Sequence, residues 1–586
     1  EERALFGATT GKANDDHLDV PDRWMRKTAD YRGVARRGQG FIAADERFLD
    51  IFRVPAPGVR SVAACVRGMG IECDPSNVSP GTMEAPSTPS DAEQSLLRWL
   101  DSEPADAVED DLAALRARMH DAFGGTAAGP ATSDALLCAL AERMGDIGGR
   151  LRPLLLARQL PVDVPLFEAN EQLCVLALDV ATAVSAAAGR AGRARPGGGA
   201  ELCEYAIGVV TEIFVLSALA AAAPPAGTWR LAHDFAAHHE VAAAAADDPL
   251  RCAYLRLLAV AVAQPEGLTG REIAWLYDFL DARVLGAAVL ARGTGDTSAS
   301  AWWIDLGADL GPQSVARRPA PSESVLGGDL WSFNPRPMAQ KLGECIEWVT
   351  ARMTAAELAG MQGEVESLDA EEALFPPGLS PLETVALLRR LRSHWMAAPV
   401  RGQPRRQHQY VVQVGIGLQS VWDLGSGGRD DPALLQEWMV LNESPGGLAI
   451  MSVAGVRGEI EAGGALALRR KPEQAWSVCI VRWVRSDCPG QVEVGLQIIG
   501  QSFHPVMVGF RGRAVQQLSP ALALPIMEPL RRHPAMLAVA GTYASRRFVF
   551  VRGTQTVYVA QARALGLDLQ TPSVELFQYE IDPYPI

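Results

Sequence analysis

Six arginines gather within eighteen residues of a chain that is otherwise acidic, with a formal net charge of -15. Each guanidinium presents a planar fork of donors that fits phosphate oxygens or the O6/N7 edge of guanine. The net charge argues against non-specific binding to nucleic acid or to anionic lipid, because both need a positive field. It leaves open a small anionic ligand held by a local arginine cluster, and the clustered residues are Arg389, Arg390, Arg392, Arg401, Arg405 and Arg406.

A second polar motif, N-x-S-x-x-G, follows the arginines and consists of Asn442, Ser444 and Gly447. Asn and Ser side chains either bond the local backbone and fix a turn, or turn outward to a ligand. Glycine permits a positive φ or a close approach of backbone to a base. Two interpretations stay open from the residues alone. The motifs form a nucleotide site, or the turn only closes a hairpin and the arginines are solvated linker charges.

The order R-x-x-x-R (Arg401, Arg405), strand, N-x-S-x-x-G resembles the PilZ family over about residues 398–510. The resemblance implies a β-barrel whose usual ligand is the bacterial second messenger cyclic di-GMP. It also implies that Arg401 and Arg405 bind guanine and phosphate, with Arg406 as the alternative to Arg405. Asn442, Ser444 and Gly447 would then contact the other guanine face.

The segments around these motifs have clear start signals and periods. Ser380 as N-cap, Pro381 at the first helical position and Glu383 two residues later predict a helix that runs to Trp395 and delivers the chain to Arg401. Beyond residue 409 the apolar period changes to two, which predicts strands. Short antiparallel strands in this number favour a small closed barrel. The expected strands are Tyr410–Leu418, Leu448–Val453, Ala465–Arg470, Trp476–Val484 and Val492–Ile499.

The rest of the chain divides by pattern into further regions. Residues 91–370 show helical periodicity, with the nearly all-apolar segment Ala206–Leu219 expected at the centre of the helical core. Thr269 and Glu272 form a capping box that predicts another helix start. We expect a multidomain α+β chain that consists of a mixed N-terminal region (1–90), an all-α helical domain (91–370), a capped helix, arginine linker and PilZ-like six-stranded antiparallel β-barrel (371–510), and a small C-terminal β module (511–586).

Signals for enzymatic chemistry are weak. The stretch Gly7–Lys12 imitates a P-loop but is one residue short between its glycines. His233, His238 and His239 are not spaced like the H-E-x-x-H metal motif, so a partly exposed helix end is the better interpretation. No nucleophile motif is found, and we expect a protein without catalytic residues, bound metal or cofactor.

The expected function is that of a non-enzymatic cyclic di-GMP receptor. Nucleotide binding would order residues 396–408 and reorient the helical domain toward an unidentified protein partner, in motility, pilus or secretion machinery. The alternative is a degenerate PilZ scaffold that binds no nucleotide and acts through protein contacts of the helical domain.

The composition favours a location in the cytoplasm, and the PilZ resemblance implies a bacterial one. The nine cysteines are scattered and suit a reducing compartment. Charges at Asp179 and Glu212, near the centres of the two longest apolar runs, favour buried helices over membrane spans.

Overall fold

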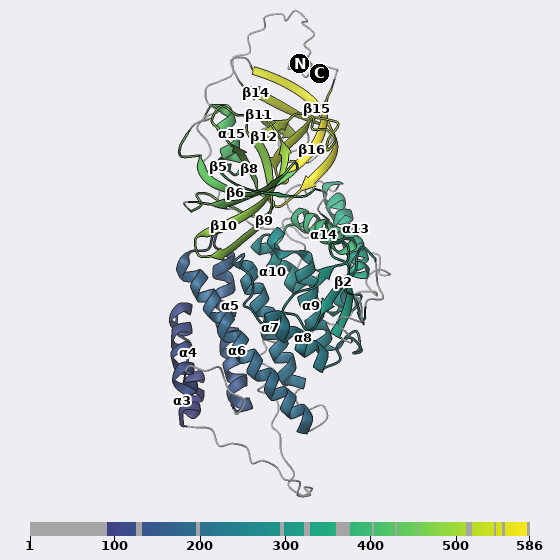
Figure 1. Ribbon diagram of the computed structural model, residues 1–586. Helices are drawn as coiled ribbons and strands as arrows, with labels where there is room; N and C mark the ends of the chain where they lie inside the picture. The colour runs from purple at the N-terminus through teal and green to yellow at the C-terminus, as the bar shows by residue number, and fades with distance from the viewer. Residues whose placement is uncertain are drawn as a thin grey trace, which may run out of the picture. The chain divides into compact units, whose positions relative to one another are not determined.

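The computed structural model describes residues 91–124, 132–194, 200–293, 298–321, 329–358, 375–400, 403–427, 431–453, 455–510, 518–543, 547–553 and 557–582. The chain divides into two compact units, Glu1–Cys73 and Asp74–Ile586, and every described residue lies in the second. The expectations for residues 1–90, for the stretch Gly7–Lys12 and for Arg401 lie outside the described residues. Within the described residues the predicted fold class is confirmed, because helices and antiparallel barrels follow one another along the chain (Figure 1).

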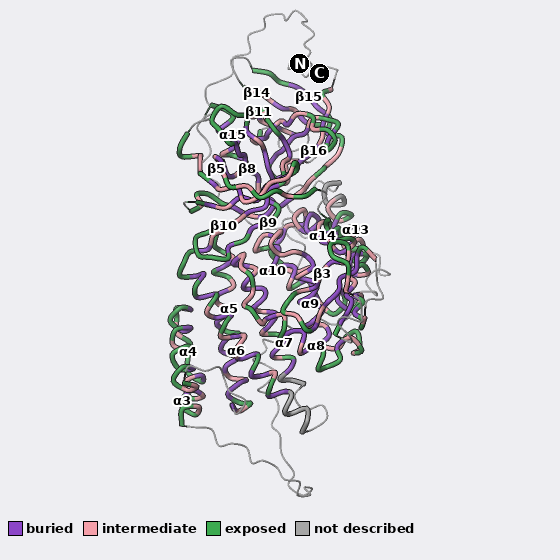
Figure 2. Tube along the Cα trace, in the orientation of Figure 1, coloured by how far each residue is buried: buried purple, intermediate pink, exposed green. Residues whose placement is uncertain are grey.

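Helices dominate the first half of the described chain, and α7 lies at their centre. It contacts the helices α5, α6, α8, α9 and α10, as its nearly all-apolar sequence predicts. Figure 2 shows buried residues running along these helices. The helices are α3 (Asp91–Leu100), α4 (Val108–Phe123), α5 (Asp134–Leu156), α6 (Val164–Ala194), α7 (Ala200–Leu219), α8 (Thr228–His238), α9 (Pro249–Ala263), the 3-10 turn η1 (Pro265–Gly267), α10 (Gly270–Phe279), α11 (Ala282–Leu285), α13 (Arg336–Leu358) and α14 (Pro381–Met396).

Both predicted helix starts are confirmed as capping boxes. The Thr269 side chain accepts from the Glu272 backbone N–H, and the Glu272 side chain accepts from the Thr269 N–H. Ser380 and Glu383 make the same reciprocal pair at the start of α14. Each box satisfies two backbone donors that an open helix end would leave unpaired.

One described helix, α6, is long and apolar enough over Val164–Ala188 to cross a membrane, and half of that window is buried within the structure. Asp179 lies inside the window, where burial raises the pKa of its carboxyl.

A small sheet interrupts the helical region, which the sequence analysis expected to be all-α. Its strands, in the order β1-β4-β2-β3, are antiparallel. Large aromatic side chains are buried on two paired strands. Trp331 and Phe333 lie on β4, and Trp302 lies on its neighbour β2. The strands are β1 (Val289–Arg292), β2 (Trp302–Asp305), β3 (Gln313–Ser314) and β4 (Leu330–Asn334).

The arginine segment leads into a closed six-stranded barrel, as predicted, which we call the first barrel. Its interior is filled by side chains that alternate along the strands, with Trp438 and Val494 fully buried. A helix absent from the sequence analysis, α15 (Leu418–Ser426), follows the first strand. The strands are β5 (Arg406–Ile416), β6 (Gln436–Ser444), β7 (Gly447–Ser452), β8 (Ala465–Arg469), β9 (Ser477–Cys488) and β10 (Gln491–Gly500).

The expected small β module is a complete second barrel. Its strands are β11 (His504–Phe510), β12 (Ser519–Leu524), β13 (Ala535–Val539), β14 (Arg547–Gly553), β15 (Val557–Gln570) and β16 (Val574–Ile581). The first barrel closes in the order β10-β7-β6-β5-β8-β9, and the second closes in the order β16-β13-β12-β11-β14-β15. Taken in chain order, the strands of both barrels follow the same cyclic order, so the two barrels share one topology.

The two barrels also share a hydrophobic core. Helix α15 packs against β5 and β8 of the first barrel and against β11 and β12 of the second (Figure 1). Buried side chains of the first barrel, such as Ala467 and Val478, join Leu537 and Leu576 of the second in one cluster. The Thr571 hydroxyl adds a buried hydrogen bond to the Gly463 carbonyl at 2.9 Å.

Candidate ligand-binding site

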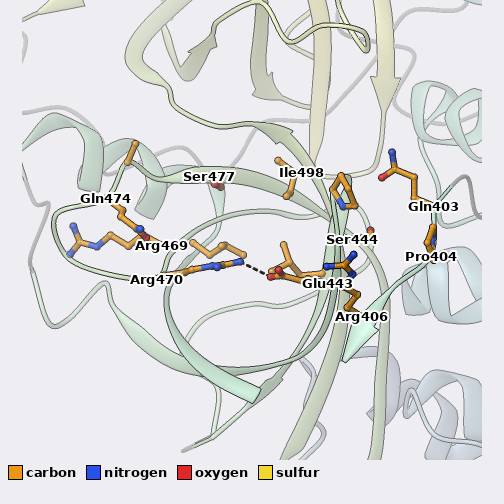
Figure 3. A pocket seen from close by; sticks show the side chains of 14 residues that line it. Gln403, Pro404, Arg406, Glu443, Ser444, Arg469, Arg470, Gln474, Ser477 and Ile498 are labelled. Carbon is orange, nitrogen blue, oxygen red and sulfur yellow. Dashed lines mark hydrogen bonds and ion pairs between the residues drawn. The ribbon is translucent and has the colours of Figure 1, made fainter. Parts of the chain in front are cut away.

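A cavity of about 690 Å³ lies at one rim of the first barrel (Figure 3). Three segments form most of its wall. They are the entry to β5 (Gln403, Pro404, Arg406), the β6–β7 hairpin (Glu443, Ser444, Pro445) and the chain around the end of β8 (Leu468, Arg469, Arg470). The hairpin and the entry to β5 meet because β5 and β6 are paired antiparallel, with Arg406 opposite Glu443. The strand pairing therefore brings the two sequence motifs to the same rim.

The arginine motif and the asparagine motif are in direct contact. Arg405 donates from Nη1 to Asn442 Oδ1 at 2.9 Å. Arg406, one residue later, is exposed at the start of β5 and lines the cavity. The family pattern implies that one arginine at this point contacts the ligand. Here Arg405 contacts Asn442, whereas its neighbour Arg406 lines the cavity. Arg401 lies outside the described residues.

The N-x-S-x-x-G motif forms a hairpin as well as a wall of the cavity. Asn442 and Ser444 end β6, and Gly447 begins β7 opposite Ser444. The Ser444 hydroxyl donates to the Gly447 carbonyl at 3.2 Å. Gly447 is buried, and a Cβ there would lie 2.2 Å from the Leu496 carbonyl oxygen on β10. Close packing between strands, with no positive φ, therefore requires a glycine at this position.

Two residues of the cavity wall, Glu443 and Arg470, belong to an ionic cluster that the sequence did not predict. Tyr410 on β5 donates its hydroxyl proton to the Glu443 carboxylate. Arg470 Nη2 lies 2.6 Å from Glu443 Oε2, and His408 Nε2 lies 3.6 Å from the other carboxylate oxygen. Glu443 occupies the unspecified position between Asn442 and Ser444, and Arg470 ends a predicted strand. Strand pairing alone brings them together, so spacing in the sequence gave no signal.

Protonation states in this cluster follow from its contacts. Burial alone would raise the pKa of Glu443, but the hydrogen bond from Tyr410 and the charge of Arg470 outweigh it and lower the pKa. Burial and the hydrogen bond to Glu443 raise the pKa of Tyr410 to about 12. Near neutral pH the cluster therefore holds a carboxylate, a phenol and a guanidinium.

Three arginines of the sequence cluster lie elsewhere, on α14. Arg390 pairs with Glu272, whose side chain is almost fully buried. The guanidinium of Arg392 lies near Gly343 of α13, and Arg389 is exposed. Of the six arginines clustered in the sequence, the described residues place Arg406 at the rim of the cavity and Arg405 in contact with the asparagine motif.

Within the histidine cluster, His233 makes hydrogen bonds to other parts of the protein. His233 is fully buried, and its two ring nitrogens lie 2.9 Å from the Tyr254 hydroxyl and 2.9 Å from the Leu310 carbonyl. Burial lowers its pKa. Across the described part of the chain, no group of three or more His, Cys, Asp or Glu side chains is placed to hold a metal ion.

Two family models match the chain. Residues 429–505 match the model described as "Cyclic-di-GMP receptor FimW, middle PilZ domain", and residues 94–291 match "Cyclic-di-GMP receptor FimW, N-terminal domain". The chain is also 33% identical over 66 residues to the Cyclic-di-GMP receptor FimW of Pseudomonas aeruginosa, strain PAO1. That alignment spans 11% of this chain and 11% of the relative's length. No solved structure matches the chain. Strands β6 to β10 of the first barrel therefore match a PilZ family model, in agreement with the resemblance that the motifs predict.

Proposed function

We propose that this PilZ-domain chain is a receptor for cyclic di-GMP and that the nucleotide binds in the cavity at the rim of the first barrel. One observation carries the proposal: two separate motifs converge on that cavity, with Arg405 bonded to Asn442 and with Arg406 and Ser444 in the wall. Both matching family models are described as parts of a cyclic di-GMP receptor. The cavity has the volume range of sites for small ligands.

Arginine suits the chemistry of this ligand. Two phosphates and two guanines present oxygens and ring edges that a guanidinium contacts in a bidentate manner. Each charge-assisted hydrogen bond contributes about 1.5–3 kcal/mol. After the costs of association, a few such bonds support dissociation constants on the order of micromolar.

The proposed output is a change in the segment that joins α14 to β5. Cyclic di-GMP would hold residues 396–408 against the first barrel, reorient the helical domain and so regulate a protein partner in the cytoplasm. The receptor would act by binding alone, without catalysis. If saturating nucleotide leaves hydrogen exchange across residues 396–408 unchanged, this part of the proposal fails while the receptor function stands.

Calorimetric titration of cyclic di-GMP tests the receptor function. We expect micromolar or tighter binding to the wild type, and loss of the heat with an Arg401→Ala/Arg405→Ala double variant. Arg563→Ala is the matched control, because Arg563 is an exposed, ion-paired arginine on the second barrel. Absence of heat with the wild type would overturn the proposal and favour a PilZ scaffold that acts through protein contacts.

A further inference from the structure

Arg470 is a cavity arginine that neither motif contains. It follows β8, next to Arg469, and both residues line the cavity. Figure 3 shows the two side chains pointing in different directions, with Arg470 directed toward Glu443. Arg469 is 2% exposed, donates to Gln413 and to the Pro472 carbonyl, and stacks over Trp476. The side chain of Arg470 is 51% exposed and thus accessible to a ligand.

Two neighbouring side chains contact the Arg470 guanidinium. Its central carbon lies 4.5 Å from the ring centroid of Tyr410. Its Nη2 atom lies 2.6 Å from Glu443 Oε2, the same oxygen that accepts from the Tyr410 hydroxyl. Tyr410 lies on β5, Glu443 lies on β6, and Arg470 directly follows β8, so the pairing of these strands holds the arrangement together. An arginine held in this way loses little side-chain freedom when a ligand binds.

Because Arg470 is paired with Glu443, it suits one part of a nucleotide better than another. Glu443 already neutralises its charge, so a phosphate at this point would have to displace the carboxylate or lie beside it. A neutral purine face meets no such repulsion and stacks well on a guanidinium plane. Arg406 lines the cavity and makes no ion pair with a carboxylate among the described residues, so it is better suited to a phosphate.

We propose that Arg470 is a specificity-determining residue on which a guanine base of cyclic di-GMP stacks, with Tyr410 beneath it and Glu443 as the positioning residue. The inference rests on the proposed function, and it adds the end of β8 as a third element of the site. Arg470 binds the base, while the arginines at the entry to β5 bind the phosphates.

Titrations with three variants test the role of Arg470. Stacking predicts that Arg470→Ala weakens cyclic di-GMP binding between about 5- and 100-fold. Arg470→Lys, which keeps the charge but loses the plane, should lose nearly as much. Arg563→Ala should bind as the wild type does, because Arg563, an arginine of similar exposure in a cross-strand pair with Glu580, lies on the second barrel. Circular dichroism and thermal unfolding verify that each variant folds, and Arg470→Gln replaces the alanine variant if that one does not fold.

Salt separates base stacking from phosphate binding. Contacts between exposed charges weaken with ionic strength, whereas stacking on a neutralised guanidinium does not. The ratio of the dissociation constants of Arg470→Ala and wild type should therefore be the same at low and high salt. A ratio that shrinks with salt, together with full affinity in Arg470→Lys, would assign Arg470 to a phosphate and overturn the inference.

A double-mutant cycle tests the positioning role of Glu443. Glu443→Gln should weaken binding in the wild-type background and have no effect when Arg470 is already alanine. Tighter binding by Glu443→Gln would mean that the carboxylate competes with the ligand, which contradicts the inference. If the wild type binds but Arg470→Ala and Arg470→Lys match it, the inference fails and the receptor function stands. If the wild type does not bind, the receptor function itself fails.

Discussion

Gly447 shows how one residue of the motif serves the barrel and the site together. Its missing side chain lets β7 approach β10 until the place of a Cβ lies 2.2 Å from the Leu496 carbonyl oxygen. That oxygen belongs to backbone and cannot rotate away as the end of a side chain would. The glycine therefore fixes where the hairpin, and with it Ser444, stands relative to the cavity.

A Gly447→Ala variant should be destabilised. Forcing a methyl group against β10 costs about 1–3 kcal/mol and displaces the hairpin. We expect a lower thermal midpoint and weaker cyclic di-GMP binding, measured by scanning calorimetry and titration. Gly446→Ala is the matched control, because nothing lies within 4 Å of a Cβ at that position. Equal midpoints for the two variants would contradict this explanation.

At the scale of elements, α14 carries the link between the helical domain and the arginine segment. Its capping box fixes its start, and its last residues lead through 397–405 into β5. Midway along the helix, Arg390 pairs with Glu272, the side chain that also caps α10. One buried carboxylate therefore holds two helices in place.

Substitution of Arg390 should destabilise the protein, because the carboxylate of Glu272 stays buried. Arg390→Ala leaves Glu272 buried without its ionic partner, which costs about 3–5 kcal/mol. Arg389→Ala, at an exposed position on the same helix, should change stability by less than about 0.5 kcal/mol. Urea unfolding followed by circular dichroism measures both variants. A similar midpoint for the two would show that Glu272 is satisfied by its cap alone.

His394, in the last turn of α14, should make the stability of the protein depend on pH. Burial lowers the pKa of His394, whose Nδ1 lies 3.1 Å from the Ala263 carbonyl, and Arg482 and Arg390 lower it further. As pH falls below about 6.5, the unfolded chain takes up this proton before the folded chain does, so stability is lost. Wild type should therefore exceed His394→Gln in stability by more at pH 7.5 than at pH 5.5. A stability gap that is constant with pH would rule out this histidine as the cause.

At the scale of the whole molecule, two barrels of one topology differ in their connections. The first joins β6 to β7 with the Pro445-Gly446 pair inside the motif, whereas the second joins β12 to β13 through residues 525–534, which contain no N-x-S-x-x-G. Within that longer connection, the buried Arg531 donates to the carbonyl of Ile499 at the end of the first barrel. The second barrel thus uses the equivalent connection to pack against the first.

Nucleotide binding should therefore slow hydrogen exchange in the first barrel and not in the second. In hydrogen exchange with saturating cyclic di-GMP, we expect slower exchange in residues 403–412, 440–448 and 468–477, which surround the cavity. Residues 547–553 and 557–581 should exchange at the same rate with and without nucleotide. Comparable protection of both barrels would place a second site on β11–β16.

Helix caps and strand patterns, which neighbouring residues encode, could be predicted from the sequence. Contacts that depend on the pairing of strands could not. Both capping boxes, the central helix and most strands of the first barrel follow from periodicity and punctuation. Helix α15 was hidden in a short, mixed stretch, and β6 (Gln436–Ser444) was not among the expected strands. In the cluster of Tyr410, Glu443 and Arg470, the first two residues lie on β5 and β6 and the third directly follows β8, so only the pairing of these strands brings them together. The three arginines of α14 were near the motif in sequence, but the helix directs them elsewhere.

The core that the two barrels share has a consequence for synthesis on the ribosome. The first barrel emerges before the second, with Ala467, Val478 and Ile480 on a face that only later strands cover. Until β12, β13 and β16 leave the exit tunnel, that apolar face is open to other nascent chains or to chaperones. Strand β16 therefore determines when the apolar outer face of the first barrel is fully covered and protected from aggregation.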